Sequence, residues 1–193
     1  MDLTETQERI TLHGLGFSQL KLGAGQRLHV WHPSLPRRDC FKSSQIHDHR
    51  FGFTSRILIG AMQNCVYRHD RTIRGSSLGT HSAYLHEGPR QATGNRPWTY
   101  DGEMKVEPAY TQELKAGDEY SMAPFVFHST TPCGDGIVVT IMKKTIEVAT
   151  HGAHSLCEIG ITPDVEFDRK QWSELRLMEV TMLALAGMGP VND

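Results

Sequence analysis

The chain has 193 residues, 38% of them hydrophobic and 22% charged, a composition that predicts one globular domain with a core of its own. A formal net charge of −2 without a basic patch argues against an electrostatic surface for nucleic acid or for an anionic membrane. No stretch reaches the roughly 18–20 apolar residues that cross a bilayer, and the first residues lack the basic start of a secretory leader, so we expect a cytoplasmic protein.

The N-terminal segment predicts a helix followed by a hairpin. Asp2-Leu3-Thr4-Glu5 has the form of a capping box, and a short helix of about ten residues is expected to follow it before Gly14. Residues 19–22 and 27–32 flank the turn Gly23-Ala24-Gly25 and are predicted to pair as antiparallel strands.

The middle of the chain predicts a series of short strands. Residues 45–53 and 55–68 form the longest extended region, and Asp101-Gly102 is a strong signal for a two-residue hairpin. Many short strands separated by turns favour an antiparallel sandwich or barrel over alternating strands and helices. Further strands are expected at residues 119–122, 126–130 and 136–144.

A polar segment interrupts this series at residues 70–97. It is rich in Gly, Arg, Ser and His and is longer than the median connection of about 4–6 residues. It suits either a lid over a barrel mouth or a surface insertion, and we favour the insertion.

The C-terminal part predicts an amphipathic helix. Asp168 is the expected N-cap, and the helix is expected to run to about Ala186. Apolar residues recur at steps of three and four, which indicates one apolar face that packs on the barrel or on a second subunit. This face contains Trp172, Leu175, Met178, Met182 and Leu185.

The four cysteines lie far apart, without any Cys-x-x-Cys spacing. This spacing argues against a zinc ribbon or a redox motif and favours free thiols in a reducing compartment. They are Cys40, Cys65, Cys133 and Cys157.

Three histidines are the candidate metal ligands. His47 and His49 alternate within an expected strand, so they project from one face and can bind the same ion. His128, at the end of a later strand-like run, is the candidate third ligand. Because the chain has eleven histidines, a His-x-His pair alone is weak evidence for a site.

Both histidine segments resemble the two sequence motifs of the cupin superfamily of small β-barrels. In the first motif, Gly60 stands where a closing glycine is expected, and Phe53 occupies the position of the usual metal-binding glutamate. If the alignment slips by one residue, Thr54 takes that position. In the second motif, Gly117 precedes His128 by eleven residues, but the second glycine of that motif is absent.

The resemblance covers roughly residues 17–148 and implies a mainly β fold with a single antiparallel barrel of the jelly-roll type. Residues 1–16 would then form a short helical extension, and residues 149–193 a C-terminal segment with the amphipathic helix. Barrels of this kind commonly associate, so the resemblance also implies a homodimer.

The three-histidine set resembles that of the dioxygenase branch of the cupins. Gln45-Ile46-His47-Asp48-His49 is similar to the first motif of the cysteine dioxygenases, although their cross-linkable cysteine has no counterpart near Phe53. The resemblance implies an oxidoreductase with non-haem Fe(II) that uses O2. It carries over the three ligands but not the substrate, and Zn or Ni also remain possible metals.

Three neutral imidazoles leave a bound divalent ion with close to its full charge. Such a site favours a small anionic substrate that chelates through a thiolate, a carboxylate or a diketone enolate. Tyr67 and Tyr120 could offer a phenol hydroxyl to the substrate, and Arg56 a guanidinium group. Arg50 and Arg68 are further candidates for pairing with a carboxylate.

Two other classes of function remain open. One is a cupin-type sugar isomerase or epimerase, in which a histidine acts as general base without a metal; the sequence does not identify the carboxylate or tyrosine that would assist it. The other is a non-catalytic barrel that binds a small ligand.

Among the remaining histidines, His29 and His32 differ in strand parity and cannot both face inward. The rest are expected to face solvent, with His86 the best exception: His69, His81, His86, His151 and His154.

Overall fold

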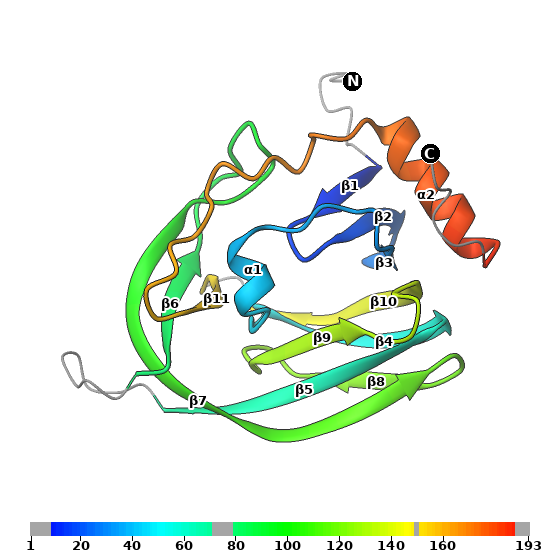
Figure 1. The fold of residues 1–193 in the computed structure, drawn as a ribbon. Coiled ribbons are helices and arrows are strands. Elements are labelled where there is room, and N and C mark those ends of the chain that lie inside the picture. Colours follow the sequence, from blue (N-terminus) through cyan, green and yellow to red (C-terminus); the bar gives the residue numbers. More distant parts are fainter. Residues whose placement is uncertain (1–8, 71–78, 149–150, 188–193) are drawn as a thin grey trace.

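The structure is a computed structural model that describes residues 9–70, 79–148 and 151–187. The fold is mainly β, and every strand pairing in these residues is antiparallel, which confirms the predicted class. Two sheets face each other, and the long strand of the second sheet curls around the molecule as a half-barrel (Figure 1).

The first sheet has six strands and contributes more residues to the lining of the interior cavity than the second sheet does. In spatial order its strands are β1 (Ile10–His13), β2 (Phe17–Gly23), β3 (Gln26–Trp31), β10 (Val138–Glu147), β4 (Phe51–Ile59) and β8 (Glu119–Met122).

The second sheet has five strands. In spatial order they are β11 (Ala153–Glu158), β6 (His81–His86), β7 (Trp98–Lys115), β5 (Ala61–Asp70) and β9 (His128–Pro132).

Residues 46–49, which contain the His-x-His pair, join the two edge strands of the five-stranded sheet. His47 exchanges two backbone hydrogen bonds with His128 at the start of β9, of 3.0 and 2.9 Å. On its other side the segment bonds to β11, where the Asp48 amide donates to the His154 carbonyl at 3.0 Å. The histidine segment therefore closes this sheet, and the regular strand β4 begins only at Phe51.

The hairpin between β4 and β5 depends on Gly60. Its φ is +76°, and a Cβ at this position would lie 2.1 Å from the Ile137 carbonyl oxygen. No side chain fits in that space, so the closing glycine of the first motif has a steric reason.

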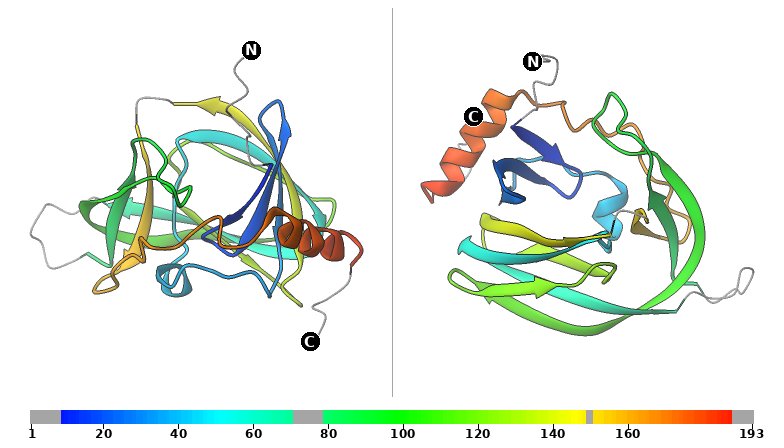
Figure 2. Two further views of the ribbon diagram at one scale, coloured as in Figure 1. Left: turned by 90° about the horizontal axis from the view of Figure 1, so that it is seen from above. Right: turned by 180° about the vertical axis from the view of Figure 1, so that it is seen from behind.

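Helix α2 (Glu174–Leu185) covers the outer face of β1, β2 and β3, as the two views of Figure 2 show. A short helix α1 (Cys40–Ser43) lies near β11. Strand alternation separates the two faces of the six-stranded sheet. Leu28 and Val30 of β3 pack in the cluster under α2, whereas Arg27 and His29 line the cavity.

The predicted start and apolar face of the C-terminal helix are both wrong. Ser173, not Asp168, is the N-cap, because its side chain accepts the Arg176 amide. The buried face is Leu177, Val180, Thr181 and Ala184. Thr181 made this face look polar in sequence, but its hydroxyl bonds the Leu177 carbonyl at 2.8 Å and lies 3.1 Å from Ser18 Oγ. The expected apolar face is instead largely exposed, including Leu175 (71%), Met178 (37%), Met182 (60%) and Leu185 (42%).

The predicted N-terminal helix does not extend into the described residues. Residues 1–8 lie outside them, and Ile10–His13 form strand β1, which pairs with β2. Alternate residues of this strand, Ile10 and Leu12, are buried under α2, which is the period of a strand and not of a helix.

Two further predictions on local structure are corrected. Asp101-Gly102 is not a hairpin turn: β7 runs continuously through it, with a shift of register opposite β6. Residues 70–97 are not wholly a surface insertion, since β6 lies within them as an interior strand; residues 71–78 lie outside the described part.

The four cysteines are free, as predicted. Among the described helices, none is long and apolar enough to span a membrane.

Candidate metal centre

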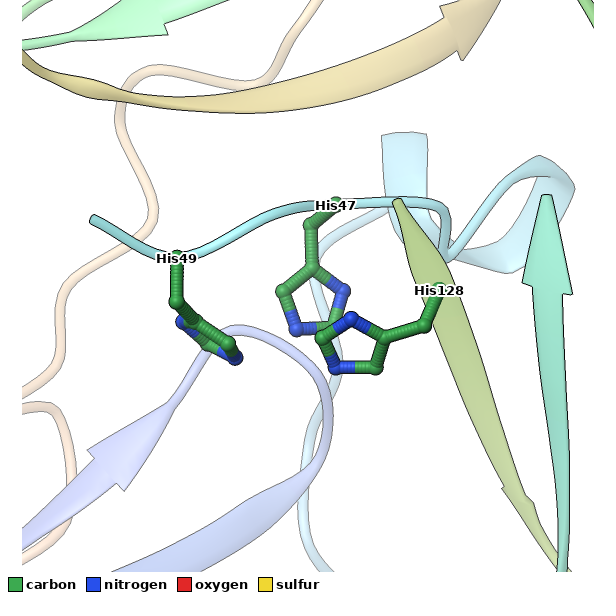
Figure 3. A group of neighbouring side chains, drawn as sticks. All are labelled: His47, His49 and His128. Atoms are coloured by element: carbon green, nitrogen blue, oxygen red, sulfur yellow. The ribbon is translucent and has the colours of Figure 1, made fainter. Parts of the chain in front are cut away.

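The three predicted histidines converge on one point. Each of these residues has a ring nitrogen that lies within 4.8 Å of a ring nitrogen of the other two: His47, His49 and His128. Figure 3 shows His47 and His49 projecting from one stretch of chain toward His128 on β9. The ring centroids are 4.5 Å apart for His47 and His128, and 4.8 Å apart for the pair in the His-x-His motif.

Backbone carbonyls orient two of the three rings. His47 Nδ1 lies 2.8 Å from the Gln45 carbonyl oxygen, and His128 Nδ1 lies 3.1 Å from that of Val126. Because a carbonyl only accepts, Nδ1 carries the proton and Nε2 keeps its lone pair for an ion. His49 is fixed by packing, since its ring stacks on Phe51 at 4.9 Å.

Burial keeps the three imidazoles neutral. Desolvation lowers the pKa of His128 to about 3 and also lowers the pKa of His47. The pKa of His49 lies well below its ordinary value, first because of burial and then because of the two neighbouring histidines. Neutral imidazole is the form that binds a metal, so these residues fit a divalent first-row ion.

An aromatic ring lies beside the three histidines, at the position where the resemblance to the cupin motif implied a glutamate. Phe53 is 5% exposed, and its ring centroid lies 5.5 Å from that of His49 and 6.0 Å from that of His128. Thr54 points the other way, with its hydroxyl 3.2 Å from Ser121 Oγ. Within the described residues, the cluster therefore contains histidines only.

A cavity of about 250 Å³ adjoins the histidines and is lined by residues of both sheets. Six arginines and one lysine line it, against the single carboxylate of Asp48, counted over the part of the chain that the structure describes. That carboxylate is already engaged, because Asp48 Oδ1 accepts the His154 amide at 2.5 Å. A cavity of this charge favours anions.

The structure separates the predicted supporting residues. Tyr120 lines the cavity, and burial raises the pKa of its phenol. Tyr67 and Arg56 do not line it. The Tyr67 hydroxyl lies 3.1 Å from Ser129 Oγ, beside a separate pocket, and Arg56 is exposed on the face of β4 opposite Phe53. Arg68 is also exposed.

Sequence reasoning missed a second polar group in the cavity wall. His154 lies on β11 and is not solvent-facing as predicted: its side chain is 12% exposed. Its Nδ1 is 3.4 Å from Asp48 Oδ2, and its Nε2 is 3.1 Å from Asp101 Oδ2. The pairing of residues 46–49 with β11 brings Asp48 to His154, and the sheet order β11-β6-β7 brings Asp101, so no local pattern signals this cluster.

His29 and His32 do not both face the cavity, as their strand parity predicted. His29 lines the cavity and His32 does not, and His86, the expected exception among the other histidines, also lines it. Burial lowers the pKa of both His29 and His86 to about 3.

No protein-family model matches this chain, and no curated protein matches it in sequence. The mainly β architecture, the curled sheet and the three-histidine cluster fit a cupin-like fold and a possible site for a divalent metal.

Proposed function

We propose that this protein is a non-haem Fe(II) dioxygenase of cupin type that acts on a small anionic chelating substrate. The observation that supports it most is the set of three neutral imidazoles with Phe53 in place of a carboxylate. The cationic lining of the adjoining cavity supports the anionic character of the substrate.

The ligand set favours a chelating anion for a reason of charge. Three neutral ligands do not cancel the charge of a divalent ion, and they leave coordination positions open. When bound, Fe(II) would supply the activation of O2. A thiolate, carboxylate or enolate would complete the charge balance that a glutamate supplies in other cupins.

The remaining residues around the site position the substrate and exclude water. Phe51 and Phe53 present aromatic surfaces next to His49. Tyr120 packs edge-on against Phe53 and, since burial raises the pKa of its phenol, keeps its proton near neutral pH. Its hydroxyl already interacts with Ser55 and Thr130, and as a protonated phenol it could also donate a hydrogen bond to an oxygen of the substrate.

Metal analysis and oxygen uptake test this proposal together. Protein purified without an affinity tag or chelator should contain close to one iron per chain and should consume O2 with a member of a panel of small thiols, carboxylates and β-diketones. His128→Ala should lose both, whereas His69→Ala, which removes an exposed histidine on β5, should keep both. If His47→Ala retained iron and turnover, the proposal would be refuted.

A second candidate function rests on His154. Asp48 lies 3.4 Å from its Nδ1 and can orient the ring, and the imidazole would act as general base of a metal-independent isomerase or epimerase once a substrate displaces Asp101, which lies 3.1 Å from Nε2. This function predicts that metal-free protein exchanges an acidic C–H proton of its substrate with D2O, and that His154→Gln abolishes the exchange. The dioxygenase predicts no activity at all without metal.

A further inference from the structure

A cluster of cations lines the cavity beside the metal centre, and we call it the cation cluster. Its members come from four different parts of the chain: β3, the residue before β4, the connection between β6 and β7, and β10. They are Arg27, Arg50, Arg90, Arg96 and Lys144. The other two cavity arginines are bound elsewhere, Arg38 to the Asp164 carbonyl and Arg169 to the Leu12 carbonyl.

One aromatic ring, Phe51, lies between two members of the cation cluster and the three histidines. Phe51 stacks on His49 at 4.9 Å between ring centroids. Lys144 Nζ lies 4.3 Å from the centroid of the same Phe51 ring, and the guanidinium carbon of Arg27 lies 5.6 Å from it. A small molecule that binds at the histidines can therefore extend along Phe51 and reach these cations.

The protein does not balance the charge of this cluster. Glu147 pairs with two members, Arg50 at 2.9 Å and Lys144 at 3.2 Å. Within the described residues, the other three form no ion pair with a carboxylate and bond only neutral oxygens, although Glu147 acts on Arg27 from a longer distance. Arg27 donates to Gln19 Oε1 at 3.1 Å, and Arg90 and Arg96 donate to backbone carbonyls of their own loop.

The members of the cluster repel one another. Burial lowers the pKa of Arg27, and the guanidinium of Arg90 lowers it further, with a smaller opposing contribution from Glu147. The pKa of Arg90 is lowered by loss of hydration and then by Arg96 and Arg50. Holding like charges together in a half-enclosed space costs free energy, which an anion of matching charge would offset.

We propose that the cation cluster binds a multivalent oxyanion, and that the substrate is a fully anionic molecule with one acidic group at the histidines and a second, phosphate-like or carboxylate group at this cluster. The first part is independent of the proposed function, and the second part rests on it. An amino acid fits less well, because its ammonium group would lie near these cations. Asp48 is the only carboxylate in the lining that the structure describes, and it already accepts the His154 amide.

The test is calorimetric titration of metal-free protein with anions of increasing charge. Acetate, succinate, inorganic phosphate and pyrophosphate should bind with affinity that rises with charge and falls with added NaCl. Tighter binding of phosphate and pyrophosphate than of succinate would identify a phosphate-bearing substrate, and the reverse order a dicarboxylate. Aspartate, which is succinate with an added ammonium group, should bind at least about tenfold more weakly than succinate, the effect of one lost charge-assisted contact.

Charge-matched variants locate the site. Arg27→Gln and Arg90→Gln should each weaken pyrophosphate binding about tenfold, because each loses a guanidinium contact to the anion. Arg56→Gln and Arg68→Gln remove the same charge from exposed positions outside the cavity and should leave binding unchanged. Arg90 lies in an exposed loop, so its variant should fold even if that of Arg27 does not, as thermal unfolding would show.

Each outcome bears on one proposal. Equal losses in Arg90→Gln and Arg56→Gln, or no binding of any anion at millimolar concentration, would overturn the anion site whatever metal the protein contains. Aspartate binding as tightly as succinate would overturn the fully anionic substrate. Intact anion binding in protein that takes up no metal would refute the dioxygenase and leave the cation cluster established.

Discussion

Replacing Phe53 by glutamate should convert the three-histidine site into a site with an acidic fourth ligand. Phe53 Cβ already projects toward the cluster, since its ring lies 5.5 and 6.0 Å from those of His49 and His128. A carboxylate at that place would bind the ion and cancel one unit of its charge. We therefore expect Phe53→Glu to bind divalent metal more tightly and to bind anions at the metal more weakly than the unchanged protein.

The size of the effect on anion binding follows from the spacing of the charges. The added carboxylate and an anion at the metal are two unit charges about 5 Å apart, which at an effective dielectric constant of about 20 repel each other by about 3 kcal/mol; the gain in metal affinity should be at least as large, because the ion is divalent and closer. This energy corresponds to a factor of roughly 10² in an equilibrium constant. The loss of the buried phenyl ring costs about 1.5–3 kcal/mol of folding stability. Phe53→Gln loses the same ring without adding a charge, so the comparison of Gln with Glu isolates the electrostatic effect.

The assay uses Co(II) as a spectroscopic substitute for the native ion. Metal affinity is measured by competition with a chelator, and anion affinity by the visible absorption change on titration with azide. Azide affinities that agree within threefold in Phe53→Glu and Phe53→Gln would show that position 53 does not face the ion. That result would refute the placement of the metal among the three histidines.

Three further predictions concern stability and assembly. Gly60→Ala should lower the free energy of unfolding by about 3 kcal/mol or more, as urea denaturation would show, since it adds a steric clash to a left-handed backbone. The control is Gly23→Ala, which has φ +88° but open space around it and should lose only about 1–2 kcal/mol. Burial holds the pKa of His29 near 3, so the folded state binds fewer protons than the unfolded state below pH 6.5, and stability falls as the pH drops. His29→Leu should remove up to about 1.4 kcal/mol per pH unit from this slope between roughly pH 6 and 4, and an unchanged slope would exclude His29 as its source. We also propose that the exposed face of α2 pairs with a second copy of the chain; Leu175→Glu with Met182→Glu should then shift sedimentation to the monomer, and an unchanged mass would contradict the pairing.

Two of the three clustered histidines could be placed from local geometry, because alternation puts His47 and His49 on one side of the chain. His128 was predicted only from the resemblance to the second motif, and long-range pairing with the segment of His47 brings it to the other two. Gly60 was likewise predicted from the resemblance, and the structure supplies the steric reason, a positive φ in a tight hairpin.

The second motif also shows where local patterns fail. Phe125, three residues before His128, has φ +61°, a conformation that favours glycine. Phe125 therefore keeps the backbone conformation that a glycine would favour, although the motif has no glycine there. The Phe125 amide donates to the His49 carbonyl at 2.8 Å, so contact with the ligand segment helps to hold a conformation that the residue itself disfavours.

The cation cluster could not be predicted because its members are far apart in sequence and none belongs to a motif. Arg50 was considered as a partner for a carboxylate, but so were Arg56 and Arg68, and only the structure distinguishes the cavity from the outer surface. Arg90 lay in a segment interpreted as a surface insertion. The net charge of −2 also gave no sign of the cluster, because it adds up all charged residues, including acidic ones that the fold places away from the cavity.

The fold gives the two parts of the site different mechanical support. The backbone of residues 46–49 bonds both edge strands of the five-stranded sheet, so the same hydrogen bonds that close the sheet also hold two ligands next to the third. The spacing of the ligands is therefore as rigid as the sheet. The cation cluster instead combines residues on β3 and β10 with Arg90 and Arg96, which lie on a loop and, in the part of the chain that the structure describes, donate to carbonyls of that loop only. Because this loop is not part of either sheet, its arginines can adjust to an anion without disturbing the three histidines. We therefore expect substitutions of Arg90 and Arg96 to change the affinity for anions while leaving the affinity for metal unaltered.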